Sequence, residues 1–154
     1  MIDIDERRIY VIVPHTVQAS DPSDGTPLAS VTMSPGRLMA QAAHVVSQMR
    51  GDESQRTRPR IAGYDIFKTT TTIVLSARNS KELDLLRRML IEHSSGGIEA
   101  MNSENPPEEK FGVCWFYDIN APFYGTDAGV QTAVCTTPVF AYQVEAVLGH
   151  LELY

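Results

Sequence analysis

The feature of this sequence that most constrains its fold is an alternation of strand-like and helix-like segments. The strand-like segments are short and rich in β-branched and aromatic residues. The helix-like segments instead repeat apolar residues every three or four positions. In chain order the pattern predicts a strand, a helix, a strand, a helix, two strands and a helix, at residues 8–13, 34–50, 69–77, 80–95, 113–117, 131–137 and 140–148. Such alternation favours an α/β fold, and we expect a three-layer α/β/α sandwich around a small four-stranded mixed sheet.

Length and composition are those of an ordinary globular domain. The chain has 154 residues, 43% of them hydrophobic and 21% charged, so we expect one domain over residues 1–154. No apolar run approaches the length of a membrane span, and the charged start M-I-D-I-D-E-R-R lacks the apolar segment of a signal peptide. We therefore expect a cytoplasmic protein with no membrane partner.

The sequence offers no pattern typical of a metal or cofactor site. The four histidines lack ligand spacing, and Cys114 and Cys135 are too far apart for a Cys-x-x-Cys pair. There is neither a phosphate-cradling glycine loop nor a dinucleotide fingerprint. We expect no metal and no cofactor, and we expect both cysteines to be free thiols in a reducing compartment.

The helix predicted at residues 34–50 carries two stripes. Ser34 is a suitable N-cap, Pro35 suits the first helical position and Gly51 is a suitable stop. The apolar stripe consists of Leu38, Ala42, Val45 and Met49. The polar stripe consists of Arg37, Gln41, His44 and Gln48. A polar stripe is usually a solvated face, and the alternative is that this one forms the working face of a site.

A carboxylate at the end of the third predicted strand is the first candidate for chemistry. Asp118 directly follows the apolar run V-C-W-F-Y, at the end of a strand where open α/β sheets bind ligands. Arg37, near the start of a helix, is its natural partner. Together with Gln41 the pair could hold a phosphate or polarise a carbonyl group. A structural ion pair that closes the strand end explains the same residues equally well.

The charge balance argues against general nucleic-acid binding. The net charge is −6, which repels a phosphate backbone, so a nucleic-acid partner would need a local basic patch. Arg56, Arg58 and Arg60 stand at alternate positions, and in an extended chain all three would point to one side. They could contact phosphates, or they could belong to a solvated loop.

Two motifs resemble those of a known family. P-G-R-L-M-A-Q-A-A-H, residues 35–44, resembles the G-K-G-K-x-A-A-Q-x-x-H signature of the archaeal and eukaryotic-type peptidyl-tRNA hydrolases. The end of the chain, G-H-L-E-L-Y, resembles the G-H-L-K-L-Y terminus of that family. The order of segments between the motifs agrees as well, so the resemblance covers nearly the whole chain from Arg8.

The resemblance implies a fold, an activity and a set of site residues. It implies an α/β sandwich, commonly a homodimer, that hydrolyses the ester bond between peptide and tRNA without a metal or organic cofactor. The residues that it places in the site are Arg37, at the position of the family's lysine, together with Gln41, Asp118 and Thr132. By the same resemblance Asp118 would orient or activate water, Arg37 and Gln41 would stabilise an oxyanion, and Thr132 would position the substrate. The family's A-G-R-T segment after the aspartate is replaced here by I-N-A-P-F-Y-G-T.

Arg37 keeps a second hypothesis open. Arginine retains the positive charge of lysine but does not readily lose a proton. The chain could therefore be a catalytically inactive or repurposed binding or regulatory module on the same fold. A third possibility is a different hydrolase or isomerase that acts on a small substrate in the same place.

Overall fold

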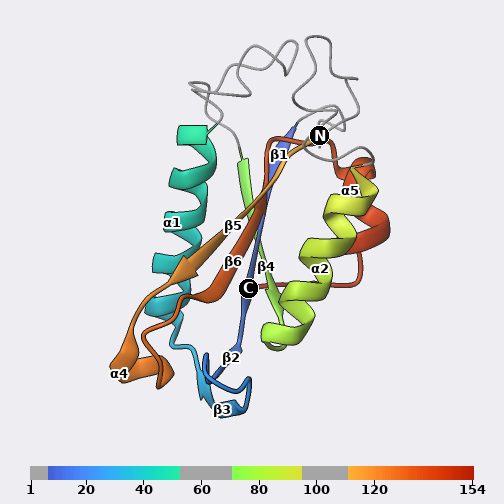
Figure 1. Ribbon diagram of the computed structural model, residues 1–154. Coiled ribbons are helices and arrows are strands. Elements are labelled where there is room, and N and C mark those ends of the chain that lie inside the picture. Colours follow the sequence, from blue (N-terminus) through green and yellow to red (C-terminus); the bar gives the residue numbers. More distant parts are fainter. Residues whose placement is uncertain (1–6, 53–70, 95–110) are drawn as a thin grey trace.

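A computed structural model describes residues 7–52, 71–94 and 111–154 of the protein (Figure 1). The described chain is a mixed α/β structure built on a five-stranded sheet with the order β5-β6-β1-β4-β7. Its strands are β1 (Arg8–Pro14), β4 (Thr71–Ala77), β5 (Val113–Asp118), β6 (Val130–Thr136) and β7 (Glu152–Leu153). The pair β1–β4 is parallel and the other pairs are antiparallel, so the expected mixed character of the sheet is confirmed.

The predicted number of strands is wrong by one, because the end of the chain adds a fifth. β7 pairs antiparallel with β4, and the Tyr154 amide donates to the Val74 carbonyl at 3.0 Å. Two residues are too short to show a strand period, so no pattern predicts this strand. The terminal motif G-H-L-E-L-Y therefore closes one edge of the sheet.

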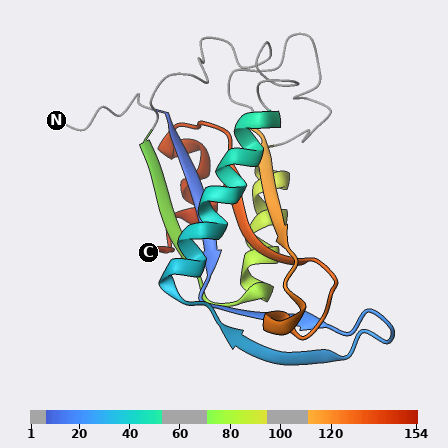
Figure 2. The ribbon, with the colours of Figure 1, turned by 90° about the vertical axis from the view of Figure 1, so that its left-hand side faces the viewer.

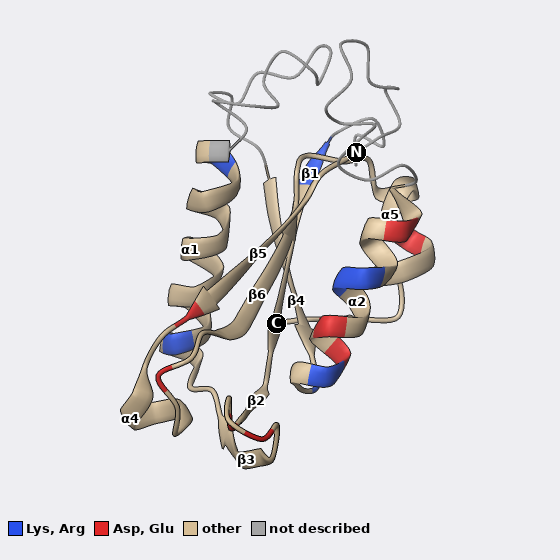
Figure 3. Ribbon diagram, in the orientation of Figure 1, with Lys and Arg blue, Asp and Glu red and all other residues tan. Residues whose placement is uncertain are grey.

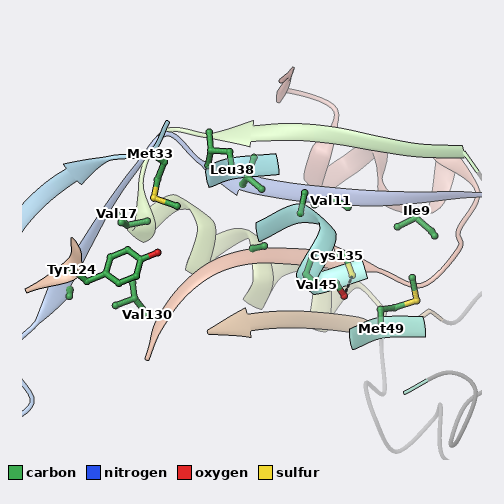
Figure 4. Close-up of a cluster of buried hydrophobic side chains, with 14 residues drawn as sticks. Ile9, Val11, Val17, Met33, Leu38, Val45, Met49, Tyr124, Val130 and Cys135 are labelled. Atoms are coloured by element: carbon green, nitrogen blue, oxygen red, sulfur yellow. Dashed lines mark hydrogen bonds between the residues drawn. The ribbon is translucent and has the colours of Figure 1, made fainter. Parts of the chain in front are cut away.

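Helices lie on both faces of the sheet (Figure 1). One face carries α1 (Pro35–Asp52), and the other carries α2 (Ser80–His93) and α5 (Ala141–Leu148). Each face has its own apolar cluster. The cluster under α1 joins that helix to β1, β6 and the short helix α4 (Ala121–Tyr124), and Figure 4 shows its central side chains. The cluster under α2 and α5 contains the buried leucines Leu83, Leu86 and Leu90.

The Pro, Gly, Asp and Ser residues between positions 15 and 33 predict a long polar connection without regular structure, and this prediction is wrong because the segment between β1 and α1 is a hairpin. β2 (Thr16–Ser20) and β3 (Pro27–Thr32) pair antiparallel as a separate two-stranded sheet. Asp21 and Asp24 close the turn through side-chain bonds to the Ser23 and Thr26 amides. The same Asp, Ser and Gly residues that suggested an irregular loop thus form a tight turn. Figure 2 shows the hairpin beyond the end of the main sheet, beside α4.

The sequence predicts Ser34 as the N-cap of α1 and Asn79, with Glu82 three residues later, as the N-cap of α2, and both caps are present. The Ser34 hydroxyl accepts a bond from the Arg37 amide at 3.2 Å, and the Asn79 side chain accepts one from the Glu82 amide at 2.9 Å. The predicted stop at Gly51 is wrong, because α1 continues through this residue to Asp52, two residues beyond the predicted end at Arg50. The helical spacing of Leu83, Leu86, Met89 and Leu90 predicts that all four are core residues, but Met89 is exposed.

Two further expectations concern cysteines and membranes. Cys114 and Cys135 are free thiols, as predicted, and they are register partners across β5 and β6. Within the described ranges, no helix has both the length and the apolar character that crossing a bilayer requires.

Candidate functional site

The polar stripe of α1 lies along β5, an edge strand of the described sheet, and it is buried only in part, since His44 and Gln48 remain exposed. Gln41, in the middle of the stripe, is only 4% exposed. Each stripe residue contacts β5 in turn: Arg37 and Gln41 reach Asp118, His44 stacks on Phe116, and Gln48 donates to the Trp115 carbonyl. The helix therefore buries an apolar stripe on the sheet and applies a second, polar stripe to its edge strand.

Three side chains converge on one oxygen of Asp118. The Tyr124 hydroxyl donates to Oδ2 at 2.7 Å, the Gln41 Nε2 group donates to it at 3.3 Å, and Arg37 Nη1 lies 4.0 Å away. No residue in the described ranges donates to the other oxygen, Oδ1. The Asp118 side chain is 21% exposed, so this second oxygen is open to water or to a ligand.

Behind the carboxylate, Gln41 is fixed by Thr132. The Thr132 hydroxyl donates to Gln41 Oε1 at 2.6 Å, and Thr132 is completely buried in β6. A carboxylate accepts hydrogen bonds only, so the Gln41 amide group must turn its NH₂ toward Asp118 and its oxygen toward Thr132. Thr132 therefore donates to Gln41, and Gln41 donates to Asp118. These two hydrogen bonds hold the Asp118 carboxylate from the buried side of the site.

On the outer side of the site, Arg37 contacts the Phe123 ring and the Asp118 carboxylate. Its guanidinium carbon lies 3.7 Å from the centre of the Phe123 ring, which is a cation–π contact. The 4.0 Å between Arg37 Nη1 and Asp118 Oδ2 is an ion pair longer than a hydrogen bond. In Figure 3 a basic segment at the start of α1 lies beside an acidic segment at the end of β5.

Tyr124 and Phe123 are members of the site that the sequence did not reveal. They belong to α4, which Asn120 caps through a bond from the Phe123 amide and which Gly125 ends in the left-handed conformation, with φ +78°. The Asn, Pro and Gly residues of the segment I-N-A-P-F-Y-G-T-D-A-G-V predict turns throughout, and this prediction overlooks α4. Its Asn cap, early proline and final glycine are the signal of a short helix that could have indicated it.

Tyr124 is held as a neutral donor. The side chain is 2% exposed and packs beside Val17 and Val130 (Figure 4). Burial, followed by the hydrogen bond to Asp118 and the charge of that carboxylate, raises the pKa of Tyr124 far above its ordinary value, with Arg37 opposing the rise. The phenol therefore stays protonated and donates to Asp118 throughout the physiological pH range.

The predicted site residues fall into two groups. The structure brings Arg37, Gln41, Asp118 and Thr132 together. The other group, Arg56, Arg58 and Arg60, lies outside the described residues.

Two further observations concern the loop and possible metal ligands. Thr126, in the loop after Asp118, accepts a bond from the Ala128 amide at 3.2 Å and so stabilises that loop. In the part of the chain that the structure describes, no three His, Cys, Asp or Glu side chains form a group that could hold a metal ion.

Comparison with known proteins gives no family for this chain. No family model matches the sequence, and no curated protein matches it. The functional argument therefore rests on the residues and their geometry.

The arrangement offers two chemical groups side by side. One is a guanidinium, which can bind an anion or a developing oxyanion. The other is a carboxylate whose Oδ2 is engaged by protein donors and whose Oδ1 can accept a hydrogen bond from water or a hydroxyl. A site of this kind can orient water next to a carbonyl group whose oxygen faces the cation.

Proposed function

We propose that this protein is a peptidyl-tRNA hydrolase-like enzyme that hydrolyses the ester bond between a peptide and tRNA. The observation that carries the proposal is that α1, β5 and β6 bring four residues together: Arg37 and Gln41 contact Asp118, and Thr132 donates to Gln41. These are the four residues that the sequence resemblance selects, and they lie far apart along the chain.

In the proposed reaction Asp118 and Arg37 have separate roles. Asp118 Oδ1 orients a water molecule and receives its proton as the water oxygen attacks the ester carbonyl. Arg37 stabilises the negative charge that develops on the carbonyl oxygen. The bond between the carbonyl carbon and the ribose oxygen then breaks, and the proton held by Asp118 passes to that oxygen, so the tRNA leaves with a free terminal hydroxyl and Asp118 is again a carboxylate. Gln41, fixed by Thr132, keeps the carboxylate in place during these steps.

The same proposal extends to partners and assembly. Arg56, Arg58 and Arg60 would contact phosphates of the tRNA, which a chain with a net charge of −6 requires as a local basic patch. The protein would act in the cytoplasm as a homodimer. We also infer the three-layer α/β/α arrangement, since α1 covers one face of the sheet and α2 and α5 cover the other.

The decisive experiment measures release of free tRNA from an N-blocked aminoacyl-tRNA. We expect turnover by the wild-type protein, loss of turnover in Asp118→Ala, and unchanged turnover in Asp127→Ala. Asp127 is an exposed carboxylate in the same loop and serves as the matched control. Wild-type turnover no higher than that of Asp118→Ala would overturn the proposal.

One observation favours a second candidate, an anion-binding module without hydrolytic activity. Position 37 holds an arginine, which binds anions well but is a poor proton shuttle. The variant Arg37→Lys separates the two candidates. An enzyme adapted to arginine loses turnover in this variant, whereas creation or a large increase of hydrolysis shows that the natural chain was not selected as this enzyme.

A further inference from the structure

We propose that α4 is a positioning element that holds Arg37 and Asp118 side by side and prevents them from closing into a direct salt bridge. Phe123 positions the cation and Tyr124 positions the carboxylate. This inference rests on the proposed hydrolysis, because it assigns to α4 the task of keeping both groups available to the substrate.

The two contacts come from adjacent residues of one rigid turn. Phe123 lies under the Arg37 guanidinium at 3.7 Å, and the Tyr124 hydroxyl donates to Asp118 at 2.7 Å. The two rings meet edge to face, with centroids 5.1 Å apart and an interplanar angle of 83°. Neither ring can shift without disturbing the other, so the distance between the cation and the carboxylate is set by α4.

The turn itself is anchored at both ends and underneath. Asn120 caps its start, and Gly125 ends it with a bond from its amide to the Ala121 carbonyl at 2.9 Å. Tyr124 packs in the apolar cluster with Val17 of β2, and the hairpin residue Leu28 packs against the same cluster. The hairpin between β1 and α1 thus provides the surface on which α4 rests.

The consequence is an ion pair that stays open. An arginine and a carboxylate with free access to each other usually form two short parallel hydrogen bonds, which would engage both carboxylate oxygens. Here the only approach is 4.0 Å, to Oδ2, and Tyr124 and Gln41 occupy that oxygen. The guanidinium therefore does not engage Oδ1, and this oxygen stays available to accept a hydrogen bond from a third molecule.

The test removes the Tyr124 hydroxyl and keeps its ring. In Tyr124→Phe we expect kcat for the blocked aminoacyl-tRNA to fall about tenfold to a hundredfold while KM stays within about twofold, because misplacement of a reacting group costs rate more than binding. Tyr142→Phe is the matched control, because this tyrosine is an exposed residue of α5. Unchanged kcat in Tyr124→Phe would overturn the inference.

A second readout does not depend on activity. In protein labelled with fluorotyrosine, the fluorine resonance that disappears in Tyr124→Phe should be the last to report ionisation as pH rises. In Asp118→Asn the same resonance should ionise at lower pH, because the neighbouring charge is gone. If the wild type hydrolyses no ester but the resonance behaves in this way, the proposed function fails and the positioning contact stands. If the resonance ionises with the other tyrosines, the positioning role is wrong whatever the activity.

Discussion

The helices α1 and α2 begin with the same kind of cap but carry opposite charges at the third helical position. Each helix has a polar cap whose side chain accepts from the amide three residues on, Ser34 in α1 and Asn79 in α2. At that third position α2 carries Glu82, and the positive end of a helix favours such an anion. At the same position α1 carries Arg37, a cation that the helix end disfavours.

The contacts of these two residues show that Glu82 has a structural role at the start of α2, whereas Arg37 at the start of α1 belongs to the candidate site. Glu82 is engaged by its own surroundings, since it accepts bonds from the Arg78 backbone and side chain at 2.8 and 2.9 Å. Arg37 instead depends on Asp118 and Phe123, which come from a distant part of the chain. A residue that opposes the local rule and is held by tertiary contacts is expected at functional sites.

The largest effect that this comparison predicts is on turnover. Asp118→Asn removes the charge opposite Arg37 and should lower kcat by roughly 10²- to 10³-fold. Asp84→Asn is the matched change on α2, where Asp84 pairs with Arg87 and Arg88 of the same helix. This second variant should keep wild-type turnover in the same tRNA-release assay. Equal losses of kcat in the two variants would mean that the Arg37–Asp118 pair has no special role in turnover.

The next largest predicted effect is on the free energy of unfolding, and it compares two buried threonines of the same strand, β6. Thr132 and Thr136 are both completely buried in β6. The Thr132 hydroxyl donates a hydrogen bond to Gln41, and the Thr136 hydroxyl accepts one from the Tyr10 amide. Replacement of either by valine should lower the free energy of unfolding by about 1–3 kcal/mol, because a buried polar partner loses its bond. Denaturant titration measures that cost. Only Thr132→Val should also lower kcat, and a Thr136→Val enzyme with reduced kcat would argue against a local site.

The caps give a smaller and equal effect. Ser34→Ala and Asn79→Ala should each lower the free energy of unfolding by about 1 kcal/mol, since each leaves one amide of a first turn without its acceptor. Thermal unfolding at a single pH compares them directly. A cost confined to one of the helices would contradict the view that the two caps are equivalent.

Much of the fold could be predicted because its signals are local. The apolar periods placed β1, α1 and β5 within one or two residues, and the capping residues marked the helix starts. The hairpin of β2 and β3 was missed because its turn residues dominate a short, polar segment. β7 was missed because its strand character depends on pairing with β4 and not on its own residues.

The site was predictable only in part. Arg37 and Asp118 could be paired from the position of a helix start and a strand end, and the resemblance added Gln41 and Thr132. Their contact could not be deduced from spacing, because it depends on how α1 lies over β5. The contribution of Tyr124 depends on a four-residue helix, which is too short to show any period.

The smallest predicted effect is on the pH dependence of the free energy of unfolding, and it concerns Glu82 of α2. Burial raises the pKa of this carboxyl, but the hydrogen bonds and charge of Arg78, with a smaller contribution from His150, lower it below its usual 4.5 overall. The folded state therefore prefers the ionised form, so Glu82 stabilises the protein above the pKa of the unfolded chain. That contribution is lost as pH falls through the lower folded pKa. Unfolding measured between pH 7 and pH 3 should show a smaller loss in Glu82→Gln than in the wild type, with turnover at pH 7 unchanged. A steeper loss in the variant would mean that Glu82 is not held as an anion, and the contrast with Arg37 at the same helical position would then fail.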